Sequence, residues 1–149
     1  MGTHIERALA LHDEKFNCAQ AVFATYAPAF GVGEVEALKA AAGFGGGMGR
    51  LQETCGAVTG GLMVLGCRYG MVRPGETEAK EETYAQVQEF VRRFREIHGT
   101  SSCRELLGCD LNTPEGMARY RENDLGTIVC AECIRSACRL LDEMVPPLR

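Results

Sequence analysis

The stretch Gly43–Gly70, GFGGGMGRLQETCGAVTGGLMVLGCRYG, decides the fold of the chain, with ten glycines, two cysteines and three charged residues. Its first part, Gly43–Gly49, is too rich in glycine for regular structure, because glycine weakens helix and strand alike and permits positive φ. Thr54 is a good N-cap. We therefore expect a helix that begins at Cys55 and runs to about Tyr69. It is apolar almost all round, which predicts a central, buried helix.

Gly56 and Gly60 lie one turn apart on one face of this expected helix. A face without side chains lets another backbone, or a cofactor, approach closely. Both interpretations stay open at this point: tight helix packing alone, and a cofactor-binding role for Gly56 and Gly60.

The rest of the chain shows helical periodicity and capping signals, without a repeat or a linker. The stripe of Tyr84, Val87, Val91, Phe94 and Ile97 predicts the buried face of one long helix. Residues 1–149 are therefore expected to form a single all-α domain, a helical bundle in which a glycine-rich loop leads into the central helix. The expected helices cover residues 4–11, 18–26, 33–42, 55–69 and 76–98, with short helices after Ser102 and Thr113 and a last one capped by Thr127.

Charge and hydropathy exclude two classes of partner. The net charge is −4, and the densest basic run, residues 92–95, lies between Glu89 and Glu96 on the long helix, which indicates a solvated face. Nucleic acid is therefore not an expected partner. The chain has no apolar run of transmembrane length, and its first 16 residues lack the apolar segment of a signal peptide. We expect a cytoplasmic protein that does not enter a membrane.

Cysteine is the unusual component, with eight in 149 residues. A disulfide framework is disfavoured in a reducing compartment, which leaves ligation of a metal or cluster, reactive thiols, or core packing. Cys18, Cys55 and Cys103 each follow an N-cap residue, and Cys130 falls in the first turn after Thr127. Helix N-termini offer free N–H donors and stabilise thiolates, so these four cysteines are the candidate site.

The other cysteines are expected to pack in the core. Cys130 and Cys133 form a single C-x-x-C without a second such pair, which disfavours a sequence-local zinc finger. Cys133 and Cys138 share the apolar stripe of the last helix, and Cys67 and Cys109 resemble them in setting. His98, at a helix end, is interpreted as a partly exposed C-terminal histidine and not as a ligand.

The sequence resembles the C-GCAxxG-C-C family of redox-active proteins over nearly its whole length, although Cys-Gly-Ala stands here in place of Gly-Cys-Ala. The matching motifs are Asn17-Cys18-Ala19-Gln20, Gly45-Gly46-Gly47, Cys55-Gly56-Ala57-Val58-Thr59-Gly60, Cys103 with Leu106-Leu107-Gly108, and Cys130 with Ile134 and Ala137.

This family is similar to the cluster-carrying part of split-Soret cytochromes, which implies an iron–sulfur centre. Carried over by position, the ligands are Cys18, Cys55, Cys103 and Cys130, with Cys133 able to replace the last. The resemblance implies no reaction or substrate.

Three functions follow from these observations. The first is electron transfer or redox sensing by a [2Fe–2S] or [4Fe–4S] cluster, a kind of centre that is often lost in air. The second is a metal-free thiol–disulfide oxidoreductase in which Cys55 attacks and another cysteine resolves. The third is a non-catalytic module with structural zinc or no metal. We expect a redox partner protein, and a homodimer is left open.

Overall fold

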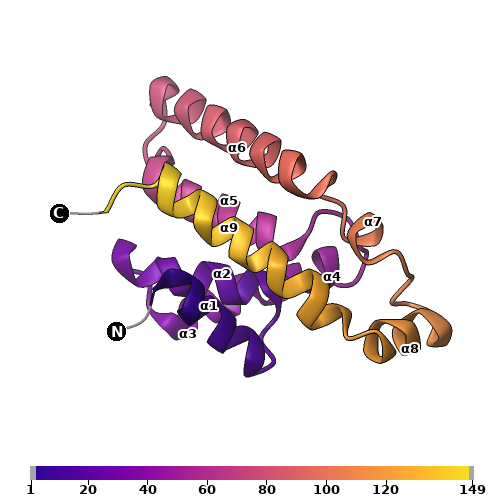
Figure 1. Ribbon diagram of the computed structural model, residues 1–149. Coiled ribbons are helices and arrows are strands. Elements are labelled where there is room, and N and C mark those ends of the chain that lie inside the picture. The colour runs from indigo at the N-terminus through magenta and orange to yellow at the C-terminus, as the bar shows by residue number, and fades with distance from the viewer. Residues whose placement is uncertain (1–2, 148–149) are drawn as a thin grey trace.

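The computed structural model describes residues 3–147, which contain helices and no strand (Figure 1). Thr54 and Ser102 form an isolated antiparallel bridge. The prediction of an all-α fold is confirmed. In chain order the elements are α1 His4–Asp13, α2 Cys18–Tyr26, the 3₁₀ turn η1 Ala27–Phe30, α3 Glu34–Ala41, the 3₁₀ turn η2 Ala42–Phe44, α4 Gly45–Met48, α5 Gly56–Tyr69, α6 Thr77–His98, α7 Cys103–Leu107, α8 Pro114–Glu122, the π-helical turn η3 Gly126–Cys130 and α9 Ala131–Met144.

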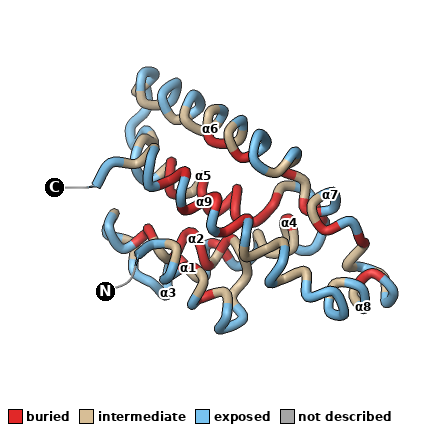
Figure 2. Tube along the Cα trace, viewed as in Figure 1, coloured by how far each residue is buried: buried red, intermediate tan, exposed pale blue. Residues whose placement is uncertain are grey.

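The helix α5 lies at the centre of the bundle, as predicted. It packs against α2, α6 and α9, while α1 covers α2 and α9 from outside. Figure 2 shows the buried residues gathered on α5, α2 and the inner side of α9, with exposed residues along α6 and α8. The long C-terminal helix α9 therefore closes a core that α2 and α5 begin.

The packing of α2 on α5 depends on glycine. A Cβ at Gly60 would lie 2.8 Å from the Ala19 carbonyl oxygen and 3.2 Å from Ala19 Cα. A Cβ at Gly56 would lie 3.0 Å from the Ala19 nitrogen. The helix-packing interpretation of this small face is confirmed, because the two backbones touch where the side chains are missing. On the α6 side, Gly61 receives Phe90 in the same way, with the ring Cζ 2.5 Å from a would-be Cβ.

The glycine-rich stretch before α5 makes a left-handed turn, so the predicted positive φ values are confirmed. The prediction that it has no regular structure is wrong only in that η2 and α4 are short helical turns. Positive φ values occur at Gly46 (65°), Gly47 (68°), Met48 (69°), Gly49 (60°) and Arg50 (64°). The Gln52 and Glu53 N–H groups close the turn on the carbonyls of residues 46 and 47, each at 3.0 Å. A left-handed conformation costs about 1–2 kcal/mol for each residue other than glycine, so the glycines lower the conformational energy of this turn.

The start of α5 differs by one residue from the prediction. Cys55 is the N-cap, with φ −52° and ψ 135°, and Thr54 does not cap the helix. The cause is a backbone contact with the segment before α7. The Cys55 N–H donates to the Ser101 carbonyl at 2.8 Å, and the Cys103 N–H donates to the Glu53 carbonyl at 2.7 Å. These bonds hold residues 53–55 extended, so helical geometry begins only at Gly56.

The other cysteine-bearing helix starts follow the predicted caps only in part. Asn17 and Gln20 form the capping box of α2, with bonds of 2.9 and 3.0 Å, which makes Cys18 its first residue. Ser102 caps α7 through the Glu105 N–H at 3.2 Å. The prediction that Thr127 caps the last helix is wrong, because the π-helical turn η3 begins at Gly126 and runs directly into α9.

The helix α6 keeps its predicted end at Gly99, whose φ is 82°, but its apolar stripe is not buried throughout. Phe90 and Phe94 are fully buried, whereas Tyr84 and Ile97 are 53% and 55% exposed, because only the middle of α6 faces α5 and α9. The predicted solvated face is confirmed by exposed ion pairs from Arg92 and Arg93 to Glu89. Within residues 3–147, no helix combines the length and apolar character that crossing a bilayer requires.

We expect Gly60→Ala to lower the free energy of unfolding by about 1–3 kcal/mol, because the new methyl group overpacks the α2–α5 contact. Gly66→Ala is the matched control in the same helix, where a Cβ meets nothing within 4 Å. This control should raise stability by about 0.5–1 kcal/mol through helix propensity. Urea unfolding followed by circular dichroism measures both, and a Gly60 variant as stable as the Gly66 variant would contradict the assigned contact.

Candidate functional site

A cavity of about 840 Å³ opens where α2, α4, α5, α7, α8 and the start of α9 meet. Each element brings a different part of the chain to it, and the lobe of α7 and α8 closes one side (Figure 1). The cysteines that line this cavity are Cys18, Cys55, Cys103, Cys130 and Cys133. All four cysteines of the predicted site are therefore brought together, with Cys133 as a fifth.

Four of the thiols form two neighbouring pairs. Cys18 and Cys130 are within hydrogen-bonding reach of each other, and so are Cys55 and Cys133. Cys103 lies near Cys55 and Cys130 and adds a fifth sulfur to the cavity. Cys55 is 7% and Cys103 8% exposed, whereas Cys133 is 1% exposed. The prediction that Cys55 lies deepest therefore holds among the four cysteines but not against Cys133.

The pair of Cys55 and Cys133 lies at the start of α5, where its two thiols differ in acidity. A hydrogen bond from Cys133, together with the backbone N–H groups of Ala57 and Val58, lowers the pKa of Cys55 in spite of its burial. The same hydrogen bond and burial raise the pKa of Cys133 well above its ordinary value. Cys55 is therefore the more acidic thiol of the pair, and Cys133 is the less acidic one.

The pair of Cys18 and Cys130 is joined by Tyr120, a residue that no sequence pattern indicated. A hydrogen bond from Cys18 lowers the pKa of Cys130, and the Tyr120 hydroxyl of α8 lowers that pKa further. The hydrogen bond to Cys130 and burial raise the pKa of Cys18. Tyr120 is a single aromatic residue in a short amphipathic helix, so only the folded chain shows that it reaches the cavity.

Cys103 is also a weakly acidic thiol, like Cys18 and Cys133. Burial and the neighbouring Cys55 and Cys130 raise its pKa to about 12, and a hydrogen bond from the Gln52 side chain opposes this shift. Gln52 itself is buried, and its amide is fixed by the Cys109 carbonyl at 2.9 Å and the Leu111 N–H at 2.8 Å. No sequence pattern selects Gln52, because its role depends on contacts with residues nearly 60 positions away.

The glycine-rich turn borders this cavity, as predicted. The cavity is lined by residues 45–47 and 49. A Cβ at Gly47 would lie 2.7 Å from Cys103 Cβ, and one at Gly56 would lie 3.2 Å from Cys18 Cβ. Glycine at both positions therefore lets cysteines from other elements approach. Gly60, predicted to bind a cofactor, does not line the cavity, because Ala19 of α2 covers it.

The remaining cysteine predictions have mixed outcomes. Cys138 is fully buried in the main core and Cys109 is buried beside α7, as expected of core residues. Cys67 is exposed near the end of α5, so its prediction as a core residue is wrong. Cys133 lies on the buried stripe of α9 and also lines the cavity, so the core interpretation was incomplete. His98 is half-buried and bonds Ser136 Oγ at 2.9 Å, away from the cysteines.

The surroundings of the cavity combine charge and donor atoms. Lys15, Arg50 and Arg121 line it together with Asp13 and Asp124, and none of the three cations forms an ion pair within residues 3–147. Unpaired cations favour negative charge on nearby sulfurs. In the described part of the chain, no three Cys, His, Asp or Glu side chains are grouped closely enough to share one metal ion. The sulfurs are therefore spread around a cavity and not clustered about a point.

We expect iodoacetamide at pH 7 to modify Cys55 and Cys130 of the reduced, metal-free protein before Cys103, because the first two have lowered pKa values. Tyr120→Phe should slow the modification of Cys130 by about tenfold, since a hydrogen bond to a charged acceptor contributes about 1.5 kcal/mol. Cys55 serves as the internal control. Mass spectrometry of each cysteine over time measures the rates, and a Cys103 that reacts as fast as Cys55 would contradict the assignment.

The profile of one protein family, described as Putative redox-active protein (C_GCAxxG_C_C), matches residues 16–144. Searches of the curated proteins and of the solved structures found no similar protein. The match runs from the residues before α2 to the end of α9, and it includes every cysteine of the cavity. The chain belongs to the C_GCAxxG_C_C family of redox-active proteins.

Proposed function

We propose that the protein is a redox protein that holds an iron–sulfur cluster through cysteine thiolates in the cavity. The observation that carries this proposal is the convergence of five cysteines, from four separate segments of the chain, on one cavity of about 840 Å³. Cysteine thiolates are the ligands of such clusters. The bound group would supply one-electron redox chemistry, for electron transfer or redox sensing.

Four cysteines suit the role of ligands. Cys18 and Cys103 begin α2 and α7, and Cys55 is the N-cap of α5, where the backbone N–H groups of Ala57 and Val58 donate to its sulfur. Cys130 or Cys133 completes the set from the last helix. A site for a single zinc ion is less well supported, because its ligands would have to gather about 2.3 Å from one point.

The rest of the cavity suits an anionic group. Lys15, Arg50 and Arg121 offset the negative charge of several thiolates. Gly47 and Gly56 leave room for close backbone approach. Tyr120 and Gln52 direct hydrogen-bond donors at Cys130 and Cys103, and donors of this kind raise the reduction potential of thiolate-ligated iron.

We expect the protein, reconstituted anaerobically with iron and sulfide, to turn brown and to hold about two or four iron atoms per chain. Changing Cys18, Cys55 or Cys103 to Ser should each abolish most of the iron content. Comparing Cys130→Ser with Cys133→Ser identifies the fourth ligand. Cys67→Ser, at an exposed cysteine outside the cavity, is the matched control. Iron analysis and the visible absorption spectrum are the measurements, and a wild-type protein that stays colourless rejects the cluster.

The contact between Cys55 and Cys133 favours a second candidate, a metal-free thiol–disulfide oxidoreductase. The Cys55 thiolate would attack one sulfur of a substrate disulfide, form a new S–S bond and release the other sulfur, which takes up a proton. Cys133 would lose its proton, attack Cys55 Sγ and release the second substrate thiol. The substrate gains two electrons and two protons, the protein ends with a Cys55–Cys133 disulfide, and an external dithiol reduces it again.

In this second case, oxidised glutathione should convert the reduced, metal-free protein to a species with one Cys55–Cys133 disulfide. Cys133→Ser should trap glutathione on Cys55, because the resolving thiol is missing, whereas Cys67→Ser should behave as wild type. Peptide mapping by mass spectrometry identifies the linked residues. Disulfides scattered over other cysteines, or no trapped adduct, would argue against Cys55 as the attacking thiol.

Both candidates need a partner that supplies or removes electrons, so a redox partner protein belongs to the proposal. The free thiols of the cavity also favour a reducing compartment such as the cytoplasm.

A further inference from the structure

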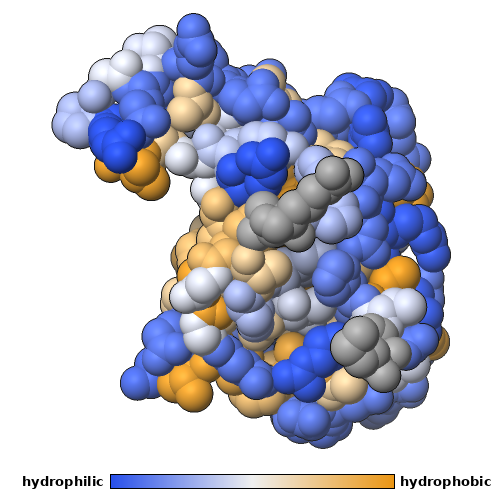
Figure 3. Space-filling view, turned by 90° about the vertical axis from the view of Figure 1, so that its left-hand side faces the viewer, coloured by the Kyte–Doolittle hydropathy of each residue, from blue (hydrophilic) through white to orange (hydrophobic). Residues whose placement is uncertain are grey.

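One flank of α6 lies beside the face that packs on the core, and it carries apolar side chains that are partly open to solvent. Val87 and Val91 are half-buried, and Tyr84 is 53% exposed. A surface cavity of about 570 Å³ runs along this flank, lined only by residues of α6. Figure 3 shows that the surface of the molecule mixes hydrophilic and hydrophobic residues, with apolar side chains gathered in a hollow on the face in view.

Large exposed apolar side chains concentrate around this helix. Of the seven such residues in the described chain, four lie on α6 or in the turn before it: Met71, Val72, Tyr84 and Ile97. Of these, Tyr84 lies on the flank of α6 described above, whereas Ile97 lies near the C-terminal end on another side of the helix.

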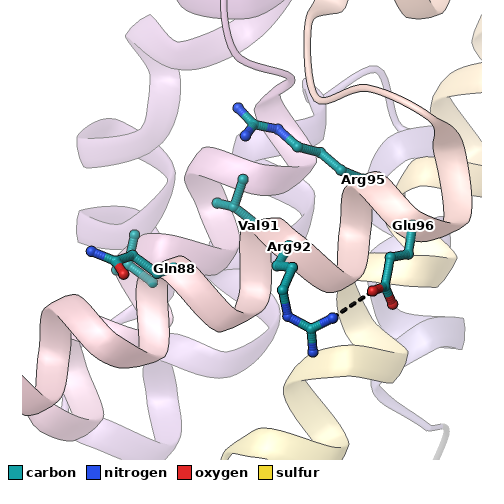
Figure 4. A pocket seen from close by; sticks show the side chains of 6 residues that line it. Gln88, Val91, Arg92, Arg95 and Glu96 are labelled. Carbon is teal, nitrogen blue, oxygen red and sulfur yellow. Dashed lines mark hydrogen bonds and ion pairs between the residues drawn. The ribbon is translucent and has the colours of Figure 1, made fainter.

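The intervals between the residues on this flank are symmetric about its centre. Tyr84, Gln88, Val91 and Arg95 follow one another at intervals of four, three and four residues, which places them on one side of a helix. In Figure 4, Val91 and Arg95 project from one side of α6, whereas Arg92 pairs with Glu96 on the other. If a second α6 lies antiparallel, Tyr84 meets Arg95 of the other copy, and Val91 meets Gln88.

The charges along α6 fit the same arrangement. Residues 78–82 carry three glutamates and one lysine, and residues 92–96 carry three arginines and one glutamate. Antiparallel pairing sets the acidic end of each helix beside the basic end of the other. Glu81 and Arg95 form no ion pair among the described residues. The Arg95 Nε–H donates to Ser101 Oγ at 3.0 Å, which leaves the two terminal nitrogens of its guanidinium for a second copy.

We propose that the protein forms a two-fold homodimer in which the α6 helices pack antiparallel through Tyr84, Gln88, Val91 and Arg95. The guanidinium of Arg95 stacks on the free face of the Tyr84 ring, because Lys80 already lies over this ring, 5.9 Å from its centre. Every contact occurs twice in such an isologous interface, so one substitution acts at two places. The cysteine cavity is lined by no residue of α6 and stays open in the dimer.

Sedimentation velocity over a range of protein concentrations tests this interface. The wild-type protein should sediment as a dimer. Tyr84→Arg sets two arginines against each other and should raise the dissociation constant by about tenfold or more, the equivalent of 1.4 kcal/mol. Ala85→Arg adds the same charge one exposed position further along the helix, and it should leave the dimer intact.

A charge swap makes the test specific to the proposed pairing. Arg95→Glu should weaken the dimer alone, and Tyr84→Arg/Arg95→Glu should restore it, since opposite charges then face each other. Circular dichroism of each variant establishes that its helices are intact. A wild-type protein that is monomeric at every concentration, equal effects of Tyr84→Arg and Ala85→Arg, or a double variant that stays monomeric would each overturn the proposal.

Discussion

The structure depends on the close approach of α2 and α5 across a face without side chains. Gly56 and Gly60 let the α2 backbone touch α5 at Ala19, at distances that no Cβ would permit. This contact fixes where α2 begins relative to α5, and with it the separation of Cys18 and Cys55. The same two helices form the floor on which α9 closes the core. Packing and site geometry therefore share one cause.

A second constraint joins the chain segment before α5 to the segment before α7. The hydrogen bonds from Cys55 to Ser101 and from Cys103 to Glu53 are 2.8 and 2.7 Å long. They hold two cysteines that are 48 positions apart in sequence beside each other. The left-handed turn of residues 46–50 makes this junction compact, since a Cβ at Gly47 would collide with Cys103. The glycine-rich stretch thus positions thiols as well as shaping a loop.

The cavity brings together several thiols that would repel one another as thiolates. Burial raises the pKa of Cys103, whereas hydrogen bonds lower the pKa values of Cys55 and Cys130. A set of buried sulfurs with such unequal acidity is costly unless protons or metal ions offset their charge. A redox reaction at these sulfurs would reduce this repulsion, because it changes their charge or bonding.

The all-α fold, the central apolar helix and the helix starts at Cys18 and Cys103 could be predicted from sequence, because caps and hydrophobic periodicity are local signals. The starts at Cys55 and in the last helix could not, since backbone contacts from distant segments moved one and a π-helical turn replaced the other. Cys133 is a core residue, as predicted, but an apolar stripe does not reveal that it also borders a cavity. Tyr120 joins the site only through tertiary structure, since a lone side chain has no pattern until other helices surround it.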